Sequence, residues 1–142
     1  MAERVSPATR RLVERRAGHR CEYCQTPARF VPETLSVEHV IPRSRLGSDS
    51  PGNLALACQG CNNHKYVRVE AEDPVGGTVV PLFHPRRDRW AAHFAWSQDG
   101  IELLGLTPKG RATVEALRLN RPGLLELRRL LVMAKLHPPN PI

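Results

Sequence analysis

Four cysteines form two closely spaced pairs, Cys21-x-x-Cys24 and Cys58-x-x-Cys61, in a chain of 142 residues. Cysteine pairs of this kind are typical of a site that binds one Zn²⁺ ion through four thiolates in a tetrahedron. Because sulfur fills all four positions, such an ion has no open position for a substrate, and we expect it to be structural. The alternative is a redox dithiol, which needs one exposed pair with a depressed pKa and leaves the second pair without a purpose.

A second set of candidate residues lies between the cysteine pairs and directly after them. Glu38 and His39 are adjacent, Asn53 follows a polar loop, and Asn62 and His64 follow the second cysteine pair. Hydrolysis of a phosphodiester bond needs a base that activates water, a divalent cation, and a scaffold that holds both in place. A lone Glu-His pair means little, so the order of all these residues along the chain carries the argument.

That order resembles the HNH endonuclease family. In the family an acidic residue precedes a histidine, a central asparagine follows, and an asparagine or histidine closes the pattern on a ββα-metal finger. The matching run extends from Cys21 to Lys65, about a third of the chain, and it is in register with both cysteine pairs. The resemblance therefore implies a ββα-metal finger with zinc knuckles.

The resemblance also implies a role for each candidate residue. His39 is the general base, and Asn53 pins the loop that orients it, so both are catalytic candidates. Glu38, Asn62 and His64 are the candidate ligands of the catalytic divalent metal. Asn62 and His64 are two residues apart and cannot share one helix face, so we favour Asn62. Glu and Asn oxygens suit Mg²⁺ or Mn²⁺, whereas recruitment of His64 also admits Zn²⁺ or Ni²⁺.

Several residues flank this centre. Arg43, Arg45 and Lys65 are candidate nucleic-acid contacts, since lysine and arginine bind phosphate through charge-assisted hydrogen bonds. The alternative for each is a solvated loop charge. The chain departs from the family at Leu46, where a second glycine is common, and at Tyr66, where a small residue is common. Either side chain could narrow the loop that would receive the nucleic-acid strand.

The composition favours a nucleic-acid partner. Lys and Arg total 21 against 14 for Asp and Glu, a formal net charge of +7, which attracts a polyanion before any specific contact forms. The N-terminal stretch has no apolar core of a secretion signal, and no segment approaches the ~20 apolar residues of a membrane span. We therefore expect a cytoplasmic protein, in which paired cysteines bind metal rather than form disulfides.

Patterns of caps, turns and apolar residues predict short elements of both kinds. Ser6-Pro7 and Thr107-Pro108 each mark a helix start, and Gln98-Asp99-Gly100 marks a hairpin turn. We expect an α+β fold in which the finger is flanked by an N-terminal helix and by a C-terminal hairpin with two helices. Predicted helices are 7–17, 108–119 and 122–136, and predicted strands are 35–41, 53–57, 79–83, 93–96 and 101–106. The predicted organisation is one domain, 1–142, with an HNH and zinc core at 19–68 and an extension at 69–142.

The favoured function is a metal-dependent endonuclease that hydrolyses phosphodiester bonds of DNA, with structural Zn²⁺ and catalytic Mg²⁺ or Mn²⁺. Its rival is a non-catalytic zinc module that binds nucleic acid. A thiol redox protein is the third hypothesis. A binding module has no need of Glu38, His39, Asn53 and Asn62 together, which favours the nuclease. DNA would be held through its backbone, and cleavage of both strands from one site favours a homodimer or two sequential nicks.

Overall fold

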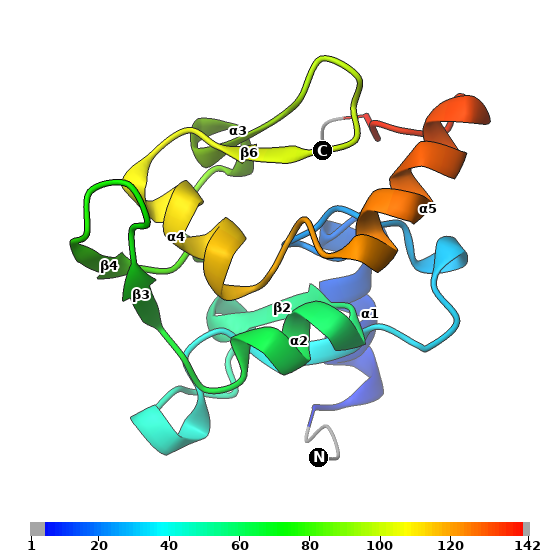
Figure 1. Ribbon diagram of the computed structural model, residues 1–142. Coiled ribbons are helices and arrows are strands. Elements are labelled where there is room, and N and C mark those ends of the chain that lie inside the picture. The colour runs from blue at the N-terminus through cyan, green and yellow to red at the C-terminus, as the bar shows by residue number, and fades with distance from the viewer. Residues whose placement is uncertain (1–4, 141–142) are drawn as a thin grey trace. The chain divides into compact units, whose positions relative to one another are not determined.

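The computed structural model describes residues 5–140, which fall into two compact units. Among these described residues, the first unit holds 5–69 together with His84–Arg87, and the second holds Glu70–Phe83 and 88–140. Helices are combined with three two-stranded antiparallel sheets within these described residues (Figure 1). The fold class is therefore α+β, as predicted, while the single-domain organisation stays a prediction.

Helix α1 (Pro7–Arg16) begins the first unit. Ser6 caps it, because its hydroxyl oxygen accepts a hydrogen bond from the backbone N–H of Thr9 at 3.1 Å. The guanidinium of Arg16 at the other end donates to the carbonyl of Pro51 at 2.7 Å. These bonds fix both the start of α1 and its attachment to the segment before the second strand.

The centre of the first unit is a ββα arrangement (Figure 1). Strand β1 (Ser36–His39) pairs antiparallel with β2 (Leu54–Ala57), and His39 lies opposite Leu54 in the register. Every residue of β2 is buried, and helix α2 (Gln59–Lys65) follows it directly. The predicted strands and the finger topology are thus confirmed. Three short 3₁₀ turns complete the unit, at Ala28–Phe30, Arg43–Arg45 and Pro51–Asn53.

The second unit contains two hairpins and three helices. Strand β5 (Phe94–Trp96) pairs with β6 (Leu103–Gly105) across the predicted turn, in which Gly100 has a φ of +79°. The other hairpin pairs β3 (Glu70–Glu72) with β4 (Val79–Pro81), and β3 was not predicted from the sequence. The remaining elements are α3 (Trp90–His93), α4 (Pro108–Ala116) and α5 (Pro122–Met133). No helix among the described residues has the length and apolar character that crossing a membrane requires.

Candidate active site and zinc site

The four cysteine thiols converge on one buried point of the first unit. Their sulfur atoms all lie within 4.8 Å of one another, and none forms a disulfide. The sulfurs of Cys24 and Cys58 are 3.8 Å apart. A tetrahedron with Zn–S bonds of about 2.3 Å has S–S edges of about 3.8 Å. The thiol cluster therefore has the size that a four-thiolate zinc site requires.

Local backbone structure shapes both halves of this cluster. In the first knuckle, the N–H of Cys21 donates to the carbonyl of Thr26 at 3.0 Å, and the N–H of Gln25 donates to the carbonyl of Cys21 at 2.9 Å. In the second knuckle, Cys58 is the N-cap residue of α2, and its sulfur accepts from the N–H of Cys61 at 3.5 Å. The two tight turns hold each pair of sulfurs on the same side.

The charge state of the thiol cluster depends on whether a cation is bound. Burial raises the pKa of the Cys21 thiol well above its usual value, because a thiolate in this interior lacks water. Zinc reverses that preference, since a coordinating thiol is deprotonated outright. The redox alternative required an exposed pair, and all four cysteines are at most 5% exposed. The cluster fits zinc and does not fit a surface dithiol.

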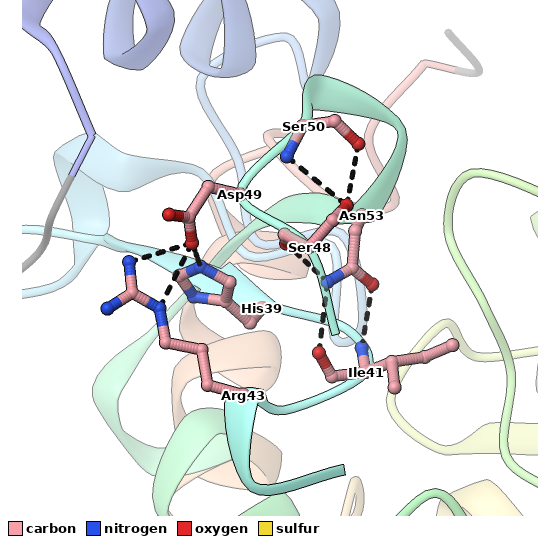
Figure 2. Close-up of polar contacts among 7 residues, drawn as sticks. All are labelled: His39, Ile41, Arg43, Ser48, Asp49, Ser50 and Asn53. Atoms are coloured by element: carbon pink, nitrogen blue, oxygen red, sulfur yellow. Dashed lines mark hydrogen bonds and ion pairs between the residues drawn. The ribbon is translucent and has the colours of Figure 1, made fainter. Parts of the chain in front are cut away.

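His39 ends β1, and its side chain is partly exposed next to the loop that joins β1 to β2. Its Nε2 atom is 2.7 Å from Oδ1 of Asp49, and the same oxygen accepts a hydrogen bond from Nη2 of Arg43 at 2.7 Å (Figure 2). Sequence reasoning missed Asp49, because a lone aspartate between two serines has no spacing signal. The structure brings His39 and Arg43 together through this residue.

The contact with Asp49 determines which histidine nitrogen is free to accept a proton. Hydrogen bonds from His39 and Arg43 hold the pKa of the Asp49 carboxyl below its usual range, so the group is ionised near neutral pH. An ionised carboxylate only accepts hydrogen bonds. Nε2 of His39 must therefore be the donor, and in the neutral imidazole the lone pair lies on Nδ1.

Asn53 closes the loop that carries these residues. Its Oδ1 atom accepts from the N–H of Ile41 at 2.9 Å, and its Nδ2 atom donates to the carbonyls of Ile41 and Ser48 at 2.9 and 2.8 Å (Figure 2). The backbone at Gly47 packs closely against that of Ile41. A Cβ atom at Gly47 would lie only 1.6 Å from the carbonyl oxygen of Ile41. Asn53 thus joins the end of β1 to the segment next to Asp49, as a residue that pins this loop would.

Glu38 is buried and pairs with a lysine. It is 5% exposed, and adjacent residues of a strand point to opposite faces, so its side chain faces away from that of His39. Its carboxylate accepts from the hydroxyl of Tyr23 at 2.6 Å and pairs with Nζ of Lys65 at 2.5 Å. Burial raises the pKa of Glu38, while the Lys65 charge opposes that change. In this structure the carboxylate belongs to an internal ion pair, and the metal-ligand role of Glu38 stays a prediction.

Lys65, a predicted nucleic-acid contact, is buried with Glu38. Its side chain is 1% exposed, and Nζ also donates to the carbonyl of Val40 at 2.8 Å. A phosphate therefore has no access to it. Arg43 and Arg45 are exposed, as phosphate contacts must be, and Nε of Arg45 donates to the carbonyl of Val67 at 3.0 Å.

Asn62 and His64 lie on α2 and are both partly exposed, whereas Cys61 and Lys65 form its buried face. Within the described part of the chain, the four cysteines are the one group of three or more His, Cys, Asp or Glu side chains close enough to share a metal ion. The ligands of a catalytic cation would therefore have to include amide, water or phosphate oxygens. Mg²⁺ usually keeps several waters and binds substrate phosphates.

A comparison with known families adds to this geometry. Residues 21–68 match the model of the HNH endonuclease family. This chain carries an HNH domain. The matched segment holds both cysteine pairs, β1, β2 and α2, so every candidate residue discussed above lies inside the HNH domain. The family indicates a nuclease function that acts on nucleic acid. No curated protein and no solved structure matched the chain.

Proposed function

We propose that the HNH domain is a metal-dependent endonuclease that hydrolyses phosphodiester bonds of DNA, with His39 as the general base. The observation that carries the proposal is the contact between His39 and Asp49 at the partly exposed end of β1. It leaves Nδ1 of the imidazole free to accept a proton, and Asn53 holds the loop that makes this contact.

In the proposed reaction, Nδ1 of His39 takes a proton from a water molecule as its oxygen attacks the phosphorus atom. The new P–O bond forms while the bond from phosphorus to the leaving sugar oxygen breaks, and that oxygen gains a proton from solvent. The Asp49 carboxylate keeps the imidazole oriented and stabilises its protonated form. A divalent cation bound beside this base would stabilise the charge that develops on the phosphate and leaving oxygens.

The residues proposed to hold that cation are on α2. With Glu38 in its ion pair, Asn62 is the favoured ligand and His64 is the alternative. An amide oxygen, waters and substrate phosphate oxygens suit Mg²⁺ or Mn²⁺. The zinc site has a separate role, because it ties the first knuckle to the start of α2 and thereby fixes the helix on which these residues lie.

DNA is proposed to bind through its phosphates. The net charge of +7 provides the general attraction, and the exposed Arg43 and Arg45 provide specific donors on the loop next to His39. Arg43 contacts the Asp49 oxygen that also contacts His39, so a phosphate bound there would lie close to the base.

One observation favours the rival function, a zinc module that binds nucleic acid without cutting it. The acidic residue before His39 is withdrawn into the core, which removes a carboxylate from the metal site. The two functions share the zinc site and the basic surface. They differ only in whether His39 acts on water, and a cleavage assay separates them.

The test is incubation of supercoiled plasmid with the purified protein and Mg²⁺ or Mn²⁺. The proposal expects nicked and linear DNA in the presence of the cation. A brief excess of EDTA should stop cleavage, and added Mg²⁺ should restore it, which distinguishes loss of the catalytic cation from loss of structural zinc. Retained plasmid binding with no cleavage under any cation would instead support the zinc module.

A further inference from the structure

Two large side chains are exposed on the loops that flank the site. Leu46 is 96% exposed and follows the 3₁₀ turn at Arg43–Arg45, and Tyr66 is 74% exposed and follows α2. Both have a positive φ, +66° at Leu46 and +52° at Tyr66. A residue with a Cβ atom is disfavoured there, and glycine adopts this conformation freely. The backbone thus favours glycine at two positions where the chain places a large apolar or aromatic group.

The two loops are connected. Nε of Arg45, the residue before Leu46, donates to the carbonyl of Val67, the residue after Tyr66, at 3.0 Å. The end of α2 is also anchored, because Nζ of the buried Lys65 donates to the carbonyl of Val40, the residue directly after β1. Leu46 and Tyr66 are therefore held on linked backbone segments next to the His39 loop. We refer to them as the Leu46–Tyr66 pair.

The surroundings of the Leu46–Tyr66 pair suit a nucleic-acid strand. The Arg45 guanidinium donates to a carbonyl oxygen, which has no formal charge. This hydrogen bond therefore does not neutralise the positive charge of Arg45, which can still attract a phosphate. Arg43 lies on the same turn and reaches toward the His39 contact. Exposed arginines can hold the phosphate of a nucleotide. A neighbouring apolar or aromatic side chain can contact its base once the base has left the stack.

On the basis of the proposed function, we propose that the Leu46–Tyr66 pair contacts an unstacked base, so that the HNH domain prefers DNA with an unpaired nucleotide to fully paired duplex. An aromatic ring stacks on any base, since every base has a π-face. An apolar side chain inserted at a base step favours its unstacking, and a base without a partner unstacks with less loss of free energy.

The test compares binding to two DNA duplexes that differ by one unpaired nucleotide, in buffer without added Mg²⁺ or Mn²⁺. The wild-type protein should bind the duplex with the unpaired nucleotide roughly 10-fold more tightly, the scale of one stacking contact. Leu46→Asn and Tyr66→Gly should lose that preference. Their melting temperatures should not fall, because asparagine and glycine tolerate a positive φ. Leu46→Met and Tyr66→Phe keep the apolar and aromatic groups and should keep the preference.

Binding without catalysis separates this inference from the function on which it rests. If the wild-type protein binds both duplexes equally, or if Leu46→Asn and Tyr66→Gly both discriminate as well as wild type, the inference is overturned while the nuclease proposal stands. If the wild-type protein binds neither duplex, the proposed function fails and the inference fails with it.

Discussion

Nε2 of His39 lies 2.7 Å from Oδ1 of Asp49, an aspartate that belongs to no sequence pattern of the chain. This contact fixes the ring orientation and leaves Nδ1 as the atom that can accept a proton. It also connects the proposed base to Arg43, which donates to the same carboxylate oxygen. The proposed chemistry therefore depends on a residue of the loop as much as on the end of the strand.

Asp49→Ala should lower kcat for DNA cleavage by roughly 10- to 100-fold with little change in KM, the usual effect of losing an orienting partner. The pKa of Asp49 is lowered by its hydrogen bonds, so the carboxylate stays ionised as pH falls to its ordinary range near 4 and protonates only below it. Ionisation of Asp49 itself should consequently cause no change in the wild-type rate across the neutral range. Steady-state rates at several pH values measure this, with Ser50→Ala on the same loop as the control.

The buried pair of Glu38 and Lys65 leads to a prediction about stability. Lys65→Met leaves a buried carboxylate without its cation and should lower the free energy of unfolding by about 3–5 kcal/mol. The double variant Glu38→Gln with Lys65→Met should recover much of that loss, because no buried charge remains. Urea unfolding measures both. A Glu38→Gln variant with normal stability but a raised Mg²⁺ requirement would show instead that Glu38 is a metal ligand.

Zinc should be part of the fold of the first unit. The purified protein should contain about one zinc ion per chain, and Cys58→Ser should lose both the ion and the cooperative unfolding of this unit, since site and fold form together. Metal analysis and circular dichroism provide the readout. A folded, zinc-free wild-type protein would contradict the assignment.

The choice between Asn62 and His64 is open to a direct comparison. If Asn62 is the ligand, Asn62→Ala should raise the Mg²⁺ concentration for half-maximal cleavage by roughly 10-fold or more, while His64→Ala should change it little. The comparison needs fixed ionic strength, because salt alone weakens DNA binding. A larger shift for His64→Ala would assign the metal to the histidine.

Much of the first unit was predictable from the sequence. The cap at Ser6 and the spacing within each cysteine pair are local signals, and α1 and the zinc cluster followed from them, whereas the ββα topology followed from the resemblance to the HNH family. Alternation along a strand also requires neighbours such as Glu38 and His39 to lie on opposite faces.

Contacts between residues far apart in sequence could not be predicted. Glu38 and Lys65 are hydrophilic residues, and only the folded chain shows that they neutralise each other in the interior. Asp49 contacts His39 through a loop whose path is set by Asn53. The 96% exposure and positive φ of Leu46 are set by the folded backbone, and its residue type does not reveal them.

Cleavage by His39→Ala is the most direct test of the central claim that this histidine is the base of a nuclease. Wild type, His39→Ala and His19→Asn are incubated with supercoiled plasmid and Mg²⁺ or Mn²⁺, and zinc content and DNA affinity are measured in parallel. His19 is an exposed histidine outside the proposed site, and asparagine suits its positive φ. The account predicts that His39→Ala alone loses cleavage while all three proteins keep zinc and bind DNA equally. Cleavage by His39→Ala at the wild-type rate would contradict it.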